Sequence, residues 1–227
     1  MAAIHKADRT VTFKIVYCGT PMSGKTTNLH YIHSCLDRST RGDLVSLATS
    51  SDRTLFFDFL AVEAAMVQGY RTRFQIYTVP GQVTYNATCQ LVLKQADGVV
   101  FVADSQMDRQ RDNMQALASL ETNLRLNGQI LQRMPLVLQY NKRDIPHCAP
   151  VEYMEYLLNS HPTRLLSFEA AAHTGHNVLA TLNAVSQLVL QRFAKLMEGR
   201  PQQQPQGPAP VPVVAESSAP AAEMALA

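Results

Sequence analysis

The sequence carries little charge and no excess of one sign. Charged residues make up 17% of the 227 residues, and 20 Lys and Arg stand against 18 Asp and Glu, which gives a net charge of +2. A protein that binds nucleic acid through the phosphates usually shows a strongly basic face or stretch. We therefore expect no nucleic-acid partner.

Long hydrophobic runs are missing as well. No apolar stretch approaches the ~20 residues that a membrane-spanning helix needs, and the N-terminus lacks the pattern of a secretory signal. Position 2 is alanine rather than the glycine that myristoylation requires, and no cysteine lies near Ala227 for prenylation. We expect a cytoplasmic protein with no transmembrane segment or lipid anchor.

Cysteine is scarce and shows no pattern. The four residues Cys18, Cys35, Cys89 and Cys148 include no C-x-x-C pair of the kind that binds zinc or forms a redox centre. We interpret them as reduced and mostly buried thiols.

Extended and helical patterns alternate along most of the chain. Continuous apolar runs at 98–103 and 135–140 indicate strands buried on both faces. Further strands are expected at 11–18, 72–79 and 165–168, extended candidates lie at 44–49 and 54–60, and helices are expected at 25–37, 109–126, 151–159 and 177–197. The last helix has its apolar stripe at Val178, Leu182, Val185, Val189, Phe193 and Leu196. This alternation predicts an α/β fold with a mostly parallel, six-stranded sheet and helices on both faces.

The composition divides the chain into three parts. Residues 1–10 are expected to form a short N-terminal extension, residues 11–198 one globular domain, and residues 199–227 a Pro-, Gln- and Ala-rich tail. The tail cannot bury enough apolar surface to offset the entropy of ordering it, so we predict disorder. The alternative is a polyproline II ligand around Pro208, Pro210 and Pro212.

A phosphate-binding loop directly follows the strand at 11–18. Gly19-x-x-x-x-Gly24-Lys25-Thr26 is a Walker A motif between a strand and a helix, the context that this motif requires. Its backbone N–H groups and the helix N-terminus suit a polyphosphate, Lys25 reaches the β- and γ-phosphates, and the Thr26 hydroxyl can ligate Mg²⁺. The nucleotide-binding residues expected here are Gly19, Thr20, Pro21, Met22, Ser23, Gly24, Lys25, Thr26 and Thr27.

A base-recognition motif follows the strand at 135–140. In Asn141-Lys142-Arg143-Asp144, the Asp144 carboxylate can accept the ring N–H and the exocyclic amine of guanine, neither of which adenine offers in that place. Asn141 can bond the base edge, and the Lys142 stem can lie over it. Further on, the backbone N–H groups of Ala172 and His173 are expected to meet the guanine carbonyl.

These motifs occur within five longer stretches of sequence. The stretches are GTPMSGKTTNLHYI, SDRTLFFDF, TRFQIYTVPGQ, DGVVFVADSQ and LQYNKRD. Together, over about residues 11–196, they resemble the MglA family of bacterial Ras-like small GTPases, and SDRTLFFDF and TVPGQ are distinctive of that family. The resemblance implies a Ras-like P-loop fold over the domain and a GTP-hydrolysing switch of cell polarity or gliding motility that uses Mg²⁺.

The resemblance also implies the catalytic residues. Gln82 matches the family glutamine that orients the attacking water, and Arg53 matches an arginine that acts in cis on transition-state charge. Without the resemblance, Gln82 would be a polar helix start and Arg53 a surface ion pair. Thr54 is the implied Mg²⁺ ligand beside Thr26.

Thr78-Val79-Pro80-Gly81 stands where guanine-nucleotide proteins usually carry Asp-x-x-Gly. The family characteristically has threonine at this place, and the Thr78 hydroxyl can still support Mg²⁺, although more weakly than a carboxylate. The Gly81 N–H can meet the γ-phosphate, so loss of that phosphate would release the segment.

Pro21 departs from the family, which usually has glycine there. Proline adds a ring and removes an N–H. Nucleotide binding should survive, whereas the effect on turnover is open in either direction. The leading interpretation is a GTPase that is slow alone and stimulated by a partner, and the alternative is a GTP-bound scaffold with little turnover. Asp144 argues against an ATP-using enzyme.

Several partners are implied by the resemblance alone. They are a roadblock-domain activator of the MglB type, expected to be a homodimer, together with nucleotide-dependent effectors and an exchange factor. Recruitment to a cell pole is implied in the same way. Beside the first switch segment lie the apolar residues Leu55, Phe56, Phe57, Phe59 and Leu60. They fit a core strand, a nucleotide-gated patch for the roadblock partner, or some of each, and the family implies a change of register here.

Overall fold

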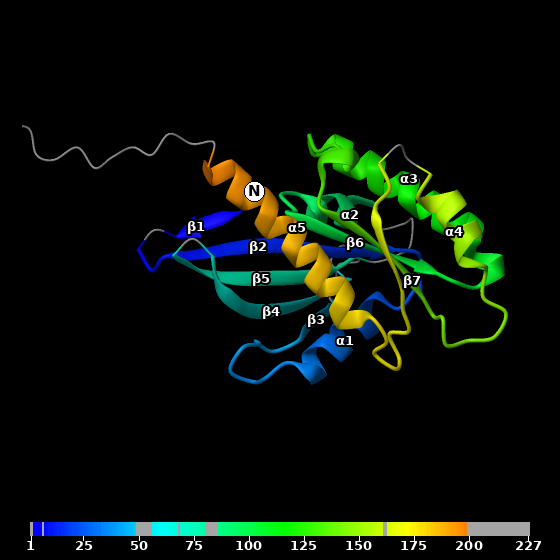
Figure 1. The fold of residues 1–227 in the computed structure, drawn as a ribbon, viewed down its shortest axis with the longest axis horizontal. Helices are drawn as coiled ribbons and strands as arrows, with labels where there is room; N and C mark the ends of the chain where they lie inside the picture. The colour runs from blue at the N-terminus through cyan, green and yellow to red at the C-terminus, as the bar shows by residue number, and fades with distance from the viewer. Residues whose placement is uncertain are drawn as a thin grey trace, which may run out of the picture.

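An eight-stranded sheet forms the centre of the molecule (Figure 1). The computed structural model describes residues 2–5, 7–48, 56–67, 69–79, 86–160 and 163–198. The strands are β1 (Ala3–His5), β2 (Thr10–Gly19), β3 (Val45–Ala48), β4 (Phe56–Val67), β5 (Tyr70–Thr78), β6 (Gly98–Asp104), β7 (Leu136–Asn141) and β8 (Leu166–Glu169). The helices are α1 (Lys25–Cys35), α2 (Asn86–Leu93), α3 (Gln110–Leu126), α4 (Val151–Leu158) and α5 (Val178–Glu198), with the 3-10 turns η2 (Met107–Arg109) and η3 (Leu131–Arg133).

The strand order confirms a mostly parallel sheet. The order is β3-β4-β5-β2-β6-β7-β8, and the five strands from β5 to β8 along this path are parallel to one another. β4 runs antiparallel to both β3 and β5, and β1 pairs antiparallel with the start of β2. The sheet therefore has two strands more than the six expected. No expected segment corresponds to β1, whereas β3 lies within the extended candidate at 44–49.

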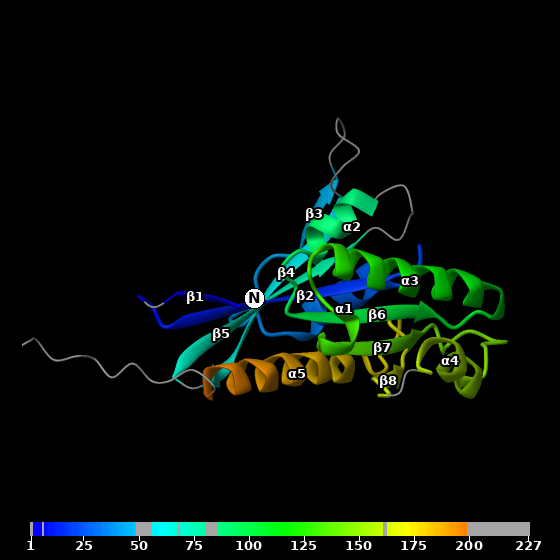
Figure 2. The same ribbon diagram turned by 90° about the horizontal axis from the view of Figure 1, so that it is seen from above.

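Helices cover both faces of the sheet (Figure 2). α1 and α5 pack on one face over Phe13, Ile15 and Tyr17 of β2, and α2, α3 and α4 pack on the other over Val16 and Cys18. β6 and β7 are buried along their whole length, as strands covered on both sides must be. The two continuous apolar runs thus mark the middle of the sheet.

α5 lies close against the central strands. The Phe193 ring meets the Phe13 ring edge-on at 5.2 Å between centroids. A Cβ atom on Gly98 would come within 2.6 Å of Val189 Cγ2, so the absence of a side chain at Gly98 permits this approach. The expected apolar stripe is buried as far as Phe193, but Leu196 is 61% exposed and lines a surface hollow instead.

Most expected elements are confirmed within a few residues, and the differences are local. β4 runs on to Val67, well beyond the extended candidate at 54–60, and no expected segment corresponds to α2. The prediction of mostly buried thiols is wrong: Cys18 is buried, Cys35 is exposed, and Cys89 and Cys148 are half-buried. No helix within the described residues is long and apolar enough to cross a membrane.

Some predictions fall outside the described residues. They concern the tail with its prolines, the segment 49–55 and the segment 80–85. The three-part division of the chain therefore stays a prediction.

Candidate nucleotide-binding site

The expected phosphate loop joins the carboxyl end of β2 to α1. Gly19, Met22 and Gly24 have positive φ angles of 142°, 59° and 96°. A Cβ atom on Gly19 would lie 2.0 Å from the Val102 carbonyl oxygen, and one on Gly24 would lie 2.2 Å from Asn141 Nδ2. Both glycines of the Walker motif are therefore required for backbone conformation and for close approach.

Lys25 folds back over the loop that precedes it. Its Nζ donates to the carbonyl oxygens of Thr20 at 2.6 Å and Gly19 at 3.2 Å. Burial of the ammonium lowers the pKa of Lys25 to about 8, and the nearby Cys18, Cys89 and Asp58 oppose this shift. At neutral pH the group is still mainly protonated and can meet an anion.

The remaining loop residues differ widely in exposure. Thr20 and Ser23 are buried, and their hydroxyls have no hydrogen-bond partner within the described structure. Met22 is 86% exposed, and Thr26 and Thr27 lie on the exposed side of the first turn of α1. The loop thus has two buried hydroxyl groups, whereas Met22, Thr26 and Thr27 are exposed to solvent.

Asn141 joins the three segments expected to surround a nucleotide. Its Nδ2 donates to the Ser23 carbonyl oxygen of the phosphate loop at 2.7 Å. Its Oδ1 accepts from the Ala172 N–H at 2.8 Å. The side chain therefore acts as a brace within the protein, and because the Ala172 N–H is used there, the exposed His173 is the residue placed to offer its N–H to a base.

The other residues of the base motif lie around this brace. Asp144 is exposed, and Lys142 has a positive φ of 67°. Lys142 Nζ lies 2.7 Å from Oδ2 of Asp104, a carboxylate that is only 1% exposed. Sequence reasoning missed Asp104, although it stands at the end of the buried run 98–103, where a charged residue needs a partner.

A second missed carboxylate is Asp58 on β4. Thr26 Oγ1 donates to Asp58 Oδ2 at 2.6 Å, and Thr78 Oγ1 donates to the same oxygen at 2.9 Å. Ser46 Oγ donates to Asp58 Oδ1 at 2.6 Å, and the Asp58 N–H donates back to Thr78 Oγ1 at 2.9 Å. The structure thus brings the expected residues Thr26 and Thr78 together, through an acid within the distinctive stretch SDRTLFFDF.

This cluster fits a hard cation that binds mainly to a nucleotide. Hydroxyl and carboxylate oxygens are the ligands that Mg²⁺ prefers, and Mg²⁺ usually needs only one or two protein groups beside substrate phosphates. Within the described residues, no three His, Cys, Asp or Glu side chains gather into a metal site of their own. The residues present therefore suit Mg²⁺ held together with phosphates.

The predicted catalytic residues lie outside the described residues. Arg53 and Thr54 precede β4, and Gly81 and Gln82 follow β5, so their roles stay predictions. Pro21 is described: its carbonyl oxygen accepts from Arg109 Nη2 at 3.4 Å, and Arg109 Nη1 pairs with Asp112 at 2.8 Å. The loop proline is thereby in contact with the start of α3.

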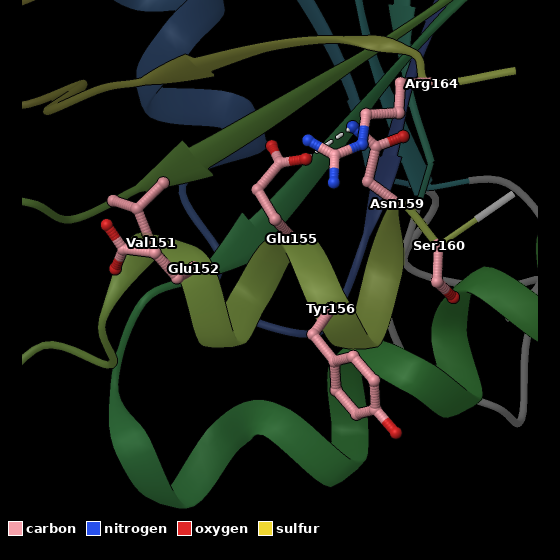
Figure 3. A pocket seen from close by; sticks show the side chains of 7 residues that line it. All are labelled: Val151, Glu152, Glu155, Tyr156, Asn159, Ser160 and Arg164. Carbon is pink, nitrogen blue, oxygen red and sulfur yellow. Dashed lines mark hydrogen bonds between the residues drawn. The ribbon is translucent and has the colours of Figure 1, made fainter.

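A separate cavity of about 270 Å³ lies at α4 (Figure 3). Glu155 in its wall accepts from the Tyr140 hydroxyl at 2.9 Å and from Asn159 Nδ2 at 2.8 Å. None of the predicted nucleotide-binding residues lines this cavity. The site described above is therefore distinct from it.

Comparison with known proteins shows the family of the chain. Residues 3–189 match the model of the ADP-ribosylation factor family. The chain is 48% identical over 195 residues to the mutual gliding-motility protein MglA of Myxococcus xanthus, across 86% of this chain and 99% of the relative. It is a small GTPase of the MglA family. This confirms the resemblance drawn from the five sequence stretches.

More distant relatives fall in the wider Ras-like group. The human Ras-related protein Rab-17 is 26% identical over 182 residues, which cover 79% of this chain and 77% of the relative. The Ras-related protein rab-39 of Caenorhabditis elegans is 22% identical over 182 residues, with 79% and 74% covered. As an MglA-family GTPase the chain is a GTP-binding switch protein that hydrolyses GTP, and the family usually employs Mg²⁺.

Proposed function

We propose that this GTPase is a Mg²⁺-dependent switch of the MglA type that regulates cell polarity or gliding motility through nucleotide-dependent effectors. The observation that supports it most is the set of hydrogen bonds at Asp58. Its carboxylate links Thr26, at the end of the phosphate loop, to Thr78, at the end of β5. Asp58 supplies the negative charge that threonine cannot supply at the Asp-x-x-Gly position. A site without its usual aspartate thus still has a carboxylate for the cation.

Each part of the site has a defined task in this proposal. Thr26 and Thr54 would hold Mg²⁺, with Asp58 and Thr78 beside them, and the cation neutralises charge on the phosphates. Lys25 binds the β- and γ-phosphates. Asp144 and the His173 N–H read the base.

Hydrolysis itself is assigned to Gln82 and Arg53. Gln82 orients a water whose oxygen forms a bond to the γ-phosphorus, while the bond from that phosphorus to the β–γ bridging oxygen breaks and GDP leaves. Arg53 stabilises the charge that develops on the transferred group. Loss of the γ-phosphate then removes the partner of the Gly81 N–H and releases the second switch segment.

The partners and the location follow the same reasoning. We expect a roadblock-domain activator of the MglB type, effectors that bind one nucleotide state, an exchange factor, and recruitment from the cytoplasm to a cell pole. Residues 11–198 would be the GTPase domain, with residues 1–10 and 199–227 as flanking segments.

Pro21 supports one alternative, a GTP-bound scaffold with little turnover. The proline lies in the phosphate loop with its carbonyl held by Arg109, at a place where the family usually has glycine. Its ring occupies space near the position expected for the γ-phosphate and Gln82. If this ring blocks the attacking water, the protein would bind GTP without hydrolysing it.

The deciding experiment is single-turnover hydrolysis of bound GTP with Mg²⁺, with and without a cognate roadblock protein. The switch is supported if the activator raises the rate by orders of magnitude and if Gln82→Ala and Arg53→Ala each abolish that rise while retaining nucleotide. Intact GTP under both conditions would favour the scaffold. Pro21→Gly would then show whether the proline is the cause.

A further inference from the structure

A buried carboxylate stands behind the base-recognition motif. Asp104 is the last residue of β6 and lies opposite Asn141 in the register with β7. Its Oδ2 is 2.7 Å from Lys142 Nζ, and the side chain is only 1% exposed, against 26% for the lysine. A buried charge is costly unless it is paired and hydrogen-bonded, so this pair accounts for the presence of an acid at the end of an apolar strand.

The start of α3 holds Asp104 in place. Its Oδ1 accepts from the Gln106 N–H at 3.1 Å and from Gln106 Nε2 at 3.2 Å. Its own N–H donates to Asn113 Oδ1 at 3.0 Å, and its carbonyl oxygen accepts from Asn113 Nδ2 at 2.8 Å and Gln110 Nε2 at 3.1 Å. Both the backbone and the carboxylate of Asp104 are therefore fixed by one short segment.

Lys142 is constrained at its backbone as well. It has φ +67°, and its carbonyl oxygen accepts from Cys148 Sγ at 3.2 Å. The neighbouring Arg143 N–H donates to the Ala170 carbonyl oxygen at 2.9 Å. With both ends of the side chain held, its four-carbon stem loses most of the rotamer freedom that a lysine normally keeps.

We propose that Asp104 is a positioning residue for the guanine base. Its carboxylate fixes the ammonium of Lys142, so that the lysine stem already lies where the face of the base will rest. This inference rests on the proposed nucleotide site and assigns to Asp104 a role in retaining the nucleotide. Ordering a side chain before binding lowers the cost of binding, and changes in such contacts appear mainly in the dissociation rate.

A purely structural role makes a different prediction. If Asp104 served only to join β6 to α3, its effect on nucleotide release would not depend on Lys142. The two roles can therefore be separated by a double-mutant cycle between Asp104 and Lys142.

The experiment measures release of a fluorescent GDP from the full chain with Mg²⁺ and excess unlabelled GDP. It compares the unaltered chain, Asp104→Asn, Lys142→Met and the double variant. We expect each single variant to release GDP about tenfold faster, by analogy with groups that orient metal ligands. The double variant should release GDP no faster than Lys142→Met alone.

A control and a second variant keep the result interpretable. Glu63→Gln alters an exposed ion pair between Glu63 of β4 and Arg73 of β5 and should leave the rate unchanged. If Asp104→Asn does not fold, Gln106→Ala loosens the same carboxylate without removing its charge, and it should still raise the rate, by up to about tenfold.

Three results would overturn the inference. These are an unchanged rate for Asp104→Asn, an unchanged rate for Gln106→Ala where Asp104→Asn is unfolded, and a further tenfold rise when Asp104→Asn is added to Lys142→Met. Failure of the unaltered chain to bind GDP at all would instead overturn the proposed function. The two failures are therefore distinguishable.

Discussion

At the scale of the residue, two acids distinguish this site. Asp58 and Asp104 come from different strands, and each meets a motif residue at the carboxyl edge of the sheet. Neither belongs to a nucleotide-binding motif. We therefore expect these acids to act on the ligand through the threonine and lysine side chains that do belong to such motifs.

Asp58→Asn should weaken the response to Mg²⁺ more than the binding of nucleotide itself. The change removes the charge next to Thr26 and Thr78 but keeps the size of the side chain. We expect the Mg²⁺ concentration that half-maximally slows GDP release to rise about tenfold, as for other groups that orient metal ligands. A titration of GDP release against Mg²⁺ measures this, and an unchanged midpoint would remove Asp58 from the cation site.

Lys25 makes nucleotide affinity depend on pH. Burial lowers its pKa in the folded protein from 10.5 to about 8, so below pH 8 it is protonated in both the folded and the unfolded chain. Between pH 8 and 10.5 the folded chain releases this proton first, and this group alone makes stability rise with pH. Binding of phosphates needs the ammonium, however, so GDP affinity should fall roughly tenfold from pH 7 to 9.

The matched control for this pH profile is Lys25→Arg. A guanidinium stays protonated throughout the range, so whatever affinity this variant retains should not show the decline. Equilibrium GDP binding at several pH values measures both proteins. A flat profile for the unaltered chain would show that Lys25 remains charged at pH 9.

At the scale of the element, packing of α5 on β6 depends on the absence of a side chain at Gly98. Gly98→Ala would place Cβ 2.6 Å from Val189 Cγ2 and 3.0 Å from Val185 Cγ2. Such overpacking costs about 1–3 kcal/mol. Val189→Ala removes the atom in the way, so the double variant should be more stable than Gly98→Ala alone, as denaturant unfolding would measure. A double variant that is less stable than Gly98→Ala would show that the helix does not lie on Gly98 in this way.

Elements with one dominant periodicity could be predicted from the sequence, and those formed by tertiary contacts could not. The stripe from Val178 to Phe193 predicts α5 because a helix on a sheet needs one continuous apolar face. β1 has three residues and exists only through pairing with β2, so it leaves no local pattern.

The same distinction applies to the site. Walker A and the base motif are local in sequence, and the structure brings them together as expected. Asp58 and Asp104 reach Thr26 and Lys142 across 32 and 38 residues, so their roles depend on strand order and register. Sequence spacing alone gives neither the strand order nor the register.

At the scale of the whole molecule, the hydrophobic core does not continue beyond α5: the core on the α1 and α5 face of the sheet ends within α5, and the core on the other face includes no residue of α5. Phe193 is the last buried residue of the described chain, and the partly buried Met197 packs against the same core. A chain that ends at Glu198 should therefore keep the thermal midpoint and the GDP release rate of the full chain. Thermal unfolding and GDP release test this together, and faster release after truncation would assign a role in nucleotide retention to residues 199–227.

Asn141 has a consequence for how the protein is made. Its side chain bonds to Ser23, which lies 118 positions earlier in the chain, and to Ala172, which lies 31 positions later. Translation proceeds from the N-terminus, so the phosphate loop leaves the ribosome long before its brace can form. A nascent chain cannot assemble the whole site until residue 172 has emerged, so we expect full GTP binding only when synthesis of the domain is nearly complete.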